Sequence, residues 1–321
     1  MNEANLYQEI ATSPSAPRNG RLFSEAFQNT VNNNLPHIEV YMFSDILLTV
    51  DFDRTLTAVD GFIPQRNVEA IEYFIANGGT FTVNTGRSYV SFLPFLDRVP
   101  HNAPLLLMNG SGSYENGEFC DIVPLDIDVR PILNRLRQQF PGVNLELQNL
   151  DMHYLVDPTE EYMAYYQRRG LTHQVLDMQI HMGPFVKIGV YGDTEHREEG
   201  SDDLKKAALF DQIEEYLKGE LGENMVVLRA TPQIINVHAK GASKFLAAKR
   251  LKEKLGKKIL VCVGDEGNDV DMLRGADYAF CPSDGAVASD FPNVCECSQG
   301  AVADVIYKKI PAIVKNGLDK R

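Results

Sequence analysis

The sequence predicts an α/β protein with a doubly wound parallel sheet, into which a second, α+β domain is inserted. Short and nearly continuous apolar runs recur before residue 125 and after residue 232, and helical patterns follow them. Such runs are typical of parallel strands that are buried on both faces. The stretch from about residue 126 to 231 differs, because its strands alternate apolar and polar residues. At roughly 150 residues per domain, a chain of 321 residues accommodates both domains.

The first half of the predicted sheet alternates strands and helices. The apolar run Ile46 to Val50 reads as a buried strand, and the helix that opens at Pro64 ends at Gly78-Gly79. The segments that follow are a strand over 80–83, a helix over 89–96 and a strand over 105–108. This order predicts a parallel sheet with covering helices.

The same alternation of apolar strands and helices returns in the second half of the chain. The predicted elements there are a basic amphipathic helix over 242–255, a strand over 259–263, a short helix over 270–274, a strand over 278–280 and a closing helix over 301–314. The elements expected in the insertion are helices over 131–140, 160–169 and 202–217 and strands over 143–147, 185–191 and 225–229. We therefore expect a sheet domain over 45–125 and 232–321, an inserted domain over 126–231, and an N-terminal extension over 1–44. A short helix over 22–31 fits that extension, which we interpret as a surface arm.

Composition excludes several classes of protein. The formal net charge of −13 disfavours nucleic acid and anionic lipid as partners, because both would be repelled. No apolar run approaches the roughly 18 residues that span a bilayer, and the N-terminus has acidic residues where a secretory signal has an apolar segment. The five cysteines are odd in number and irregularly spaced, which favours reduced thiols in a cytoplasmic protein over a zinc site.

Four predicted strands end in polar, reactive residues. In an open parallel sheet the ligand site lies outside the carboxyl ends of the strands, so these four ends are expected to converge in one crevice. The segments concerned are Asp51-Phe52-Asp53, Asn84-Thr85-Gly86-Arg87, Asn109-Gly110 and Gly264-Asp265.

Two of these ends carry acids at a spacing that suits a cation. Alternation along a strand puts Asp51 and Asp53 on one face, where two buried carboxylates repel each other unless a proton or a cation intervenes. Asp265 and Asp269 follow another strand in a glycine-containing turn and can face the same cation. Oxygen ligands beside phosphate favour Mg²⁺. The alternative is a surface turn with solvated acids, and Asp269 could serve only the N-terminus of a helix.

Two further segments suit a phosphate group. Thr85-Gly86-Arg87 offers a hydroxyl and backbone N–H groups at a strand-to-helix turn, although such turns often only cap a helix. Lys244 lies one turn into its predicted helix, within reach of the crevice. A single lysine is nonspecific, and Lys240, Lys249 and Lys252 lie nearby. A positive site of this kind would offset the repulsion between an acidic protein and a phosphorylated ligand.

Taken together, four motifs resemble the haloacid dehalogenase (HAD) superfamily of phosphohydrolases. The large insertion is similar to the Cof-like group with a type C2B cap, which includes sucrose-phosphate phosphatases and phosphomannomutases. The resemblance covers residues 45–125 and 232–316. The motifs are Asp51-Phe52-Asp53-Arg54-Thr55-Leu56, Thr85-Gly86-Arg87, Gly241-Ala242-Ser243-Lys244 and Gly264-Asp265-Glu266-Gly267-Asn268-Asp269.

The resemblance implies a role for each matching residue. Asp51 is expected to be the nucleophile that forms an aspartyl-phosphate, and Asp53 the general acid and base. The resemblance places the phosphoryl group against Thr85, Gly86, Lys244 and Asn268. It places Mg²⁺ on Asp51, the Asp53 carbonyl and Asp265, with Asp269 in support. Asn109 and Gly110 are expected to line the substrate entrance. Where the family usually has glycine, this sequence has Arg54, which either contacts substrate or points away and packs.

Three hypotheses about function follow. The first is a Mg²⁺-dependent phosphatase for a small phosphorylated metabolite, with sugar phosphates among the candidates, in which the inserted domain selects the substrate. The second is a phosphomutase on the same scaffold, and the third is a sensor that binds a phosphorylated ligand without catalysis. Intact Asp51 and Asp53 disfavour the sensor. A cluster of Tyr and Arg residues over 162–169 could face substrate, but a packed and solvated helix face is the favoured interpretation.

Overall fold

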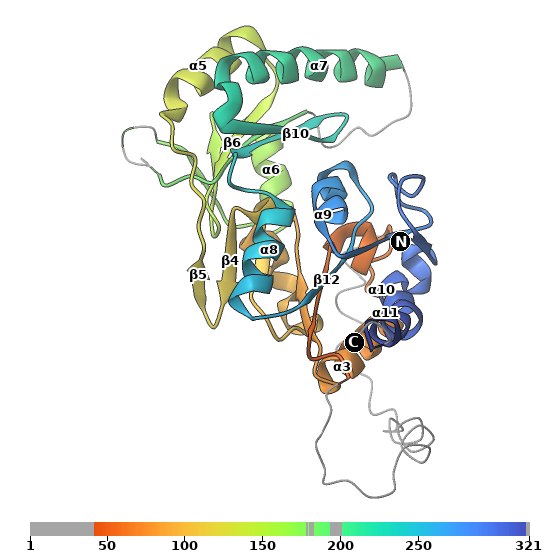
Figure 1. The fold of residues 1–321 in the computed structure, drawn as a ribbon. Coiled ribbons are helices and arrows are strands. Elements are labelled where there is room, and N and C mark those ends of the chain that lie inside the picture. The colour runs from red at the N-terminus through yellow and green to blue at the C-terminus, as the bar shows by residue number, and fades with distance from the viewer. Residues whose placement is uncertain (1–41, 178, 180–182, 193–200, 319–321) are drawn as a thin grey trace, which may run out of the picture. The chain divides into compact units, whose positions relative to one another are not determined.

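The computed structural model describes residues 42–318 apart from 178, 180–182 and 193–200 (Figure 1). These residues belong to one compact unit of the chain, Tyr41–Arg321. The helix expected over 22–31 lies outside the described residues. The described helices are α3 (Gln65–Ala76), α4 (Tyr89–Phe92), α5 (Val129–Gln139), α6 (Glu160–Arg168), α7 (Ser201–Leu221), α8 (Lys244–Lys254), α9 (Val270–Gly275), α10 (Ala301–Asp304) and α11 (Ile310–Leu318).

A five-stranded parallel sheet confirms the predicted α/β class. Its strand order is β14-β13-β12-β1-β2, and every neighbouring pair is parallel. Its strands are β1 (Ile46–Val50), β2 (Thr80–Val83), β12 (Ile259–Val263), β13 (Tyr278–Pro282) and β14 (Asn293–Val294). The central strand β1 pairs with β2 on one side and with β12 on the other. Strand β12 comes much later in the chain, since Ile46 pairs with Ile259.

Helices cover both faces of this sheet, as a doubly wound fold requires. Alternation along β1 sends Leu48 to the face covered by α3, α10 and α11, and sends Leu47 to the face covered by α8 and α9. All five residues of β1 are buried, because each of its faces packs on a helical layer. This burial explains the continuous apolar run in the sequence.

The chain after β2 departs from the predicted pattern. The strand expected over 105–108 is β3 (Leu105–Leu107), and its parallel link to the main sheet is a single bridge between Asn84 and Leu106. Its main partner is β4 (Gly112–Glu115), which is antiparallel to it and pairs in turn with β5 (Glu118–Cys120). The reversal has a backbone cause, because Met108, Asn109 and Gly110 all have positive φ angles, of 51°, 55° and 84°.

A six-stranded sheet forms most of the predicted insertion. Its order is β10-β11-β9-β6-β7-β8, with β6 (Asn144–Gln148), β7 (His153–Val156), β8 (His173–Val175), β9 (Lys187–Tyr191), β10 (Met225–Thr231) and β11 (Ile234–Ala239). Strand β11 pairs with both β9 and β10, so this sheet includes residues beyond 231. The domain limits themselves stay a prediction. Strands β7, β8 and β11 were not predicted.

The two faces of the six-stranded sheet differ in polarity. One face packs Leu147, Ile188 and Val237 against α5 and α7. The opposite face carries buried polar residues, and α6 covers part of it through Tyr162 and Tyr166 (Figure 1). No helix in the described part of the chain is long and apolar enough to cross a membrane.

Candidate active site

The carboxyl ends of β1, β2 and β12 meet at one edge of the parallel sheet. The ladder continues past the strands, because the Asp51 N–H donates to the Val263 carbonyl and the Asn84 N–H donates to the Val50 carbonyl, both over 2.8 Å. Asp51 therefore lies between the ends of the two neighbouring strands. Asp265 follows β12 by two residues, so the predicted convergence of these strand ends is present.

Three buried acids gather at this edge. Asp51, Asp265 and Asp269 each place a carboxylate oxygen within 4.8 Å of the others. The Asp269 Oδ2 atom accepts hydrogen bonds from the backbone N–H groups of Asp265 and Glu266, at 3.0 and 3.1 Å. Gly264 is required here, since a Cβ atom at that position would lie 2.6 Å from the Asp269 side chain. The absence of a side chain at Gly264 thus lets the Asp269 carboxylate approach the backbone N–H of Asp265.

The donor set of these acids fits a divalent cation. Thr55 Oγ1 donates to Asp265 Oδ1 over 2.7 Å, whereas the buried Asp265 Oδ2 has no hydrogen-bond partner among the described residues. Burial raises the pKa of Asp265 to about 7, although the hydrogen bond from Thr55 by itself would lower it. A buried carboxylate oxygen without a partner, facing two further carboxylates, is what a hard cation with oxygen ligands would satisfy.

Lys244 supplies the positive charge of the site. Its side chain is buried, and its Nζ atom lies 2.6 Å from both Asp51 Oδ1 and Asp269 Oδ1. Burial alone would lower the pKa of Lys244, but the two carboxylates raise it above its ordinary value. Burial raises the pKa of Asp51, and the Lys244 ammonium opposes that shift. Asn84 fixes the start of α8 by donating from Nδ2 to the Lys244 carbonyl over 2.8 Å.

Asp53 pairs with Arg87 and does not belong to the group of three acids. Arg87 donates from Nε to Asp53 Oδ2 at 2.8 Å and from a terminal nitrogen to Asp53 Oδ1 at 2.7 Å. The Arg87 guanidinium also lies 5.1 Å from the ring centres of Phe52 and Phe95. The Asp53 carboxylate is therefore paired with Arg87, although its charge still raises the pKa of Asp51, and the role of the Asp53 main-chain carbonyl as a metal ligand stays a prediction. Sequence reasoning missed this bidentate pair, although Arg87 belonged to a recognised motif.

The predicted entrance residues form a second, neutral network. Asn268 Nδ2 donates to Asn109 Oδ1 over 3.1 Å, and Asn109 makes a 3.2 Å hydrogen bond with His238 Nε2. Gly86 approaches the same amide closely, since a Cβ atom there would lie 3.1 Å from Asn109 Oδ1. Gly110, with φ +84°, packs against the Ser243 carbonyl, which leaves no room for a side chain. Thr85 is buried and accepts from the Arg87 N–H at 3.1 Å.

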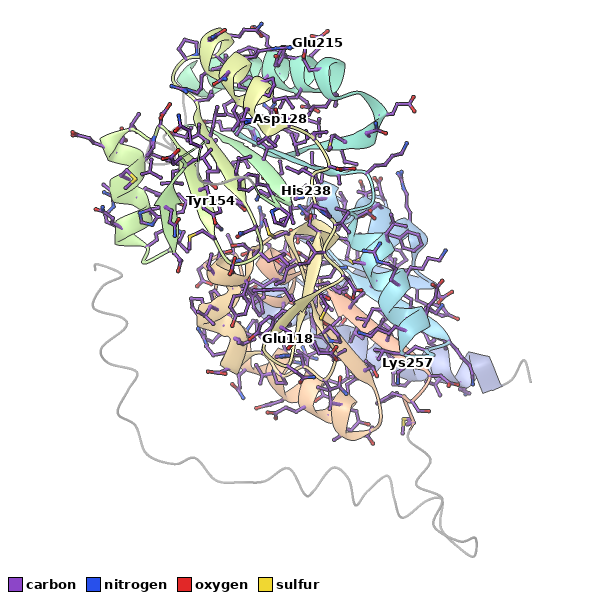
Figure 2. The ribbon with its side chains drawn as sticks, turned by 90° about the vertical axis from the view of Figure 1, so that its left-hand side faces the viewer. Glu118, Asp128, Tyr154, Glu215, His238 and Lys257 are labelled. Carbon is purple, nitrogen blue, oxygen red and sulfur yellow. The ribbon has the colours of Figure 1, made fainter. Side chains whose placement is uncertain are left out.

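His238 is a residue that sequence reasoning missed. It comes from β11 and also makes a 2.9 Å hydrogen bond with Ser111. Figure 2 shows His238 on the side of the six-stranded sheet that faces the parallel-sheet part of the fold. A lone histidine 129 residues from its partner Asn109 gives no local signal in the sequence.

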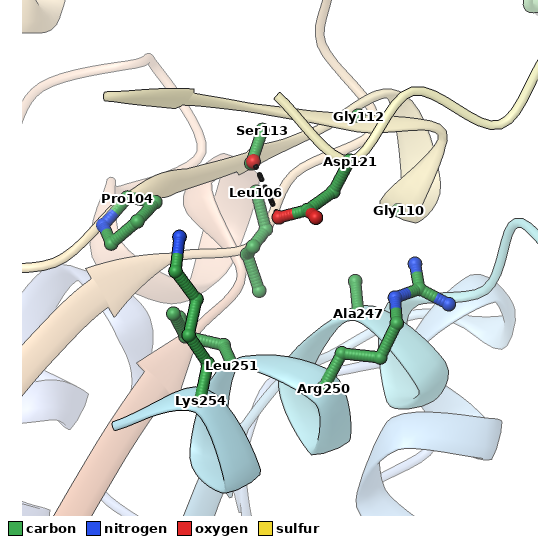
Figure 3. A pocket seen from close by; sticks show the side chains of 10 residues that line it. All are labelled: Pro104, Leu106, Gly110, Gly112, Ser113, Asp121, Ala247, Arg250, Leu251 and Lys254. Carbon is green, nitrogen blue, oxygen red and sulfur yellow. Dashed lines mark hydrogen bonds between the residues drawn. The ribbon is translucent and has the colours of Figure 1, made fainter. Parts of the chain in front are cut away.

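One pocket in the described residues lies away from these acids. It has a volume of about 100 Å³ between α8 and the β3–β4 hairpin (Figure 3). Its one carboxylate, Asp121, accepts from Ser113 Oγ over 3.2 Å, and its cations Arg250 and Lys254 are exposed. Metabolite pockets usually measure about 300 Å³ or more. The pocket therefore does not replace the strand ends as the candidate site.

Arg54 occupies a backbone conformation that favours glycine. Its φ and ψ angles are 59° and 7°, in the left-handed region. The side chain is about half exposed and lies 3.6 Å from Glu266, an ion pair of small expected value. The structure places Arg54 beside the acid-bearing turns but leaves its role in substrate binding a prediction.

The backbone of Arg54 leads to a stability prediction. We expect Arg54→Gly to be more stable than Arg54→Ala by about 1 kcal/mol, because both remove the ion pair but only glycine removes the Cβ conflict. Urea unfolding of both variants would measure the difference in the free energy of unfolding. An alanine variant as stable as the glycine variant would contradict the argument.

The chain is similar to known proteins in both sequence and fold. Residues 48–287 match a family model described as haloacid dehalogenase-like hydrolase. A haloacid dehalogenase-like hydrolase from Bacteroides thetaiotaomicron has a TM-score of 0.67 at 19% identity, covering 82% of this chain and 98% of that chain. A sugar phosphatase of HAD subclass IIB has a TM-score of 0.65 at 17% identity, covering 82% and 99%. A HAD phosphatase, also from Bacteroides thetaiotaomicron, has a TM-score of 0.66 at 17% identity, covering 88% and 99%. No curated protein matches.

Proposed function

Since the chain belongs to the haloacid dehalogenase-like hydrolases, we propose that it is a Mg²⁺-dependent phosphatase that hydrolyses a small phosphorylated metabolite through Asp51. The observation that carries this proposal is the buried arrangement of Asp51, Lys244 and the unpartnered oxygen of Asp265 at the carboxyl edge of the sheet. Phosphoryl transfer depends mainly on positioning and charge neutralisation, and this arrangement supplies both.

In the proposed first step, an Asp51 oxygen attacks the phosphorus atom. The bond between phosphorus and the ester oxygen breaks, its electron pair goes to the leaving oxygen, and Asp53 protonates that oxygen. Lys244 holds Asp51 in place and offsets negative charge on the phosphoryl oxygens. In the second step, Asp53 takes a proton from water, which attacks the aspartyl-phosphate and releases phosphate and free Asp51.

Arg87 constrains the proposed acid and base. It holds both oxygens of Asp53, so proton transfer to the leaving group requires Asp53 to give up at least one of these hydrogen bonds. The Asp53 side chain is about half exposed, whereas Asp51, Asp265 and Asp269 are buried. We expect substrate binding to accompany this change in orientation.

Mg²⁺ would be held by Asp51, Asp265 and Asp269, with the Asp53 carbonyl as the predicted fourth protein ligand. When bound, the ion supplies positive charge beside the transferred phosphoryl group. The cytoplasm is the proposed compartment, which is supported by five cysteines that are all free of disulfides. Sugar phosphates are candidate substrates because a structural neighbour is a sugar phosphatase.

Phosphate release from a panel of phosphorylated sugars, nucleotides and cofactors tests this proposal. We expect release from at least one compound in Mg²⁺, and a loss of at least about 100-fold when EDTA replaces Mg²⁺, because the acids would then repel the substrate. Chromatography of the product distinguishes free phosphate from an isomeric phosphate ester, which a phosphomutase would form. Binding without turnover, in Mg²⁺ and across the panel, would contradict catalysis and favour a sensor.

A further inference from the structure

A row of four polar side chains crosses the six-stranded sheet on its polar face. Gln148 of β6 pairs with His153 of β7 on one side and with Lys187 of β9 on the other. Strands β9 and β11 pair Ile188 with Val237, so one further step along this register sets Lys187 beside His238. The residues next to the row, Leu147 and Ile188 among them, face α5 and α7 instead. The row therefore runs His238, Lys187, Gln148, His153.

Both ends of the row form hydrogen bonds with residues around the candidate active site. His238 makes hydrogen bonds with Asn109 and Ser111, at 3.2 and 2.9 Å. At the other end, His153 Nε2 makes a 2.6 Å hydrogen bond with Ser88 Oγ, directly after Arg87. Neighbouring strands lie about 4.8 Å apart, so Lys187 sits within about one strand spacing of His238. Lys187 is thus held between two contacts with the loops that carry Gly86, Arg87 and Asn109.

Lys187 is a buried cation that makes no direct ion pair within the described part of the chain, although the charge of Glu146 lies near it. Its exposed fraction is 6%, and its ammonium makes no hydrogen bond or ion pair with any residue that the structure describes. The nearby acid, Glu146, already accepts hydrogen bonds from Tyr162, Tyr166 and Gln148. Burial lowers the pKa of Lys187 to about 8, although the negative charge of Glu146 by itself would raise it. Burial, and after it the charge of Lys187, lower the pKa of His238 to about 3.

A buried ammonium in this state is costly unless something pairs with it. Tyr162 and Tyr166 belong to the cluster over 162–169 that could face substrate. Both hydroxyls instead donate hydrogen bonds to Glu146. Lys244 is likewise occupied, by Asp51 and Asp269. Among the described residues, Lys187 is therefore a buried positive group with capacity for a ligand, on the face of the sheet that contacts the loops of Ser88 and Asn109.

We propose that Lys187 binds a second anionic group of the substrate, so that the enzyme prefers phosphate esters that also carry a carboxylate or a second phosphate. This inference rests on the proposed phosphatase function and names the substrate class for the same site. The scissile phosphate would lie at Asp51 and Lys244, and the second anion would lie against Lys187 in the row between His238 and Gln148. Binding would give the ammonium a direct ion pair, which the residues described by the structure do not supply.

Matched pairs of substrates test this assignment in the full-length protein. The pairs are 6-phosphogluconate with glucose 6-phosphate, 3-phosphoglycerate with glycerol 3-phosphate, and fructose 1,6-bisphosphate with fructose 6-phosphate. The first two pairs report on a carboxylate and the third on a second phosphate. We expect wild type to favour the more anionic member of at least one pair, and Lys187→Met to lower kcat/KM for that member by roughly 10- to 100-fold, as for a hydrogen bond to a charged group.

Two measurements separate substrate binding from a structural role. Lys187→Met should leave kcat/KM for the less anionic partner within about twofold. It should change the melting temperature little, because the lost attraction to Glu146 opposes the gain from removing a buried charge. Lys218→Met is the matched control, since Lys218 lies exposed on α7, which covers the opposite face of the same sheet. Equal losses on both members of every pair, or a lower melting temperature with no change in preference, would overturn the assignment.

One further experiment distinguishes failure of the Lys187 proposal from failure of the phosphatase proposal. Calorimetry in an Asp51→Asn background measures binding of the same pairs without turnover, and Lys187→Met in that background should weaken only the more anionic member. If wild type hydrolyses no ester, including p-nitrophenyl phosphate, the phosphatase proposal is wrong, yet selective loss of binding would still support Lys187. Hydrolysis with no preference for the more anionic member of any pair would keep the phosphatase and reject the role of Lys187.

Discussion

Replacing Asp51 by Asn should lower kcat by at least about 10⁴-fold, since an amide does not provide the nucleophilic oxygen that forms the acyl phosphate. The substitution preserves the shape of the side chain. Lys244 would keep its contact with Asp269 at 2.6 Å, so the fold should persist. Phosphate release at saturating substrate measures the loss, and a thermal melt checks the fold.

Asp60→Asn is a matched control for this variant. Asp60 lies nine residues later, is exposed, and accepts a hydrogen bond from the Phe62 N–H that an asparagine oxygen can also accept. Its activity should stay within about twofold of wild type, as expected for a surface substitution. Turnover by Asp51→Asn at more than about a tenth of the wild-type rate would show that Asp51 is not the nucleophile.

Lys244→Met should damage both stability and catalysis. The ammonium lies between Asp51 and Asp269, and its removal would leave two buried carboxylates facing each other without a counter-charge. Breaking a buried ion pair on one side typically costs about 3–5 kcal/mol. We expect a loss of that size in the free energy of unfolding, measured by urea denaturation without metal. We also expect kcat to fall by roughly 10²- to 10⁴-fold, because phosphoryl charge would lose its protein cation.

Lys249→Met provides the comparison on the same helix. Lys249 is an exposed residue of α8, so its loss should change the free energy of unfolding by no more than about 0.5 kcal/mol. The difference between the two variants isolates burial and ion pairing from helix propensity. If both variants unfolded at the same urea concentration, the charge balance assigned to Lys244 would be wrong.

Lys244 shows where sequence reasoning was sufficient and where it was not. The motif around Gly241 singled out this lysine, while composition alone could not separate it from Lys240, Lys249 and Lys252. Burial separates them, because Lys244 is the one of the four that lies buried between two carboxylates, Asp51 at 193 residues and Asp269 at 25 residues along the chain. A local pattern carries no information about partners at such separations.

Local sequence patterns predicted four of the five strands of the parallel sheet, all but β14, and the strand ends that carry Asp51 and Asp265. Continuous apolar runs and glycine-containing turns are local features, and local features decide secondary structure where burial and propensity agree. Tertiary contacts fixed the turn of β3 into a hairpin and the pairing of Arg87 with Asp53. They also placed Lys187 between His238 and Gln148, where it makes no direct ion pair with a described residue. Those outcomes depend on strand register and packing between distant segments, which side-chain type and spacing do not specify.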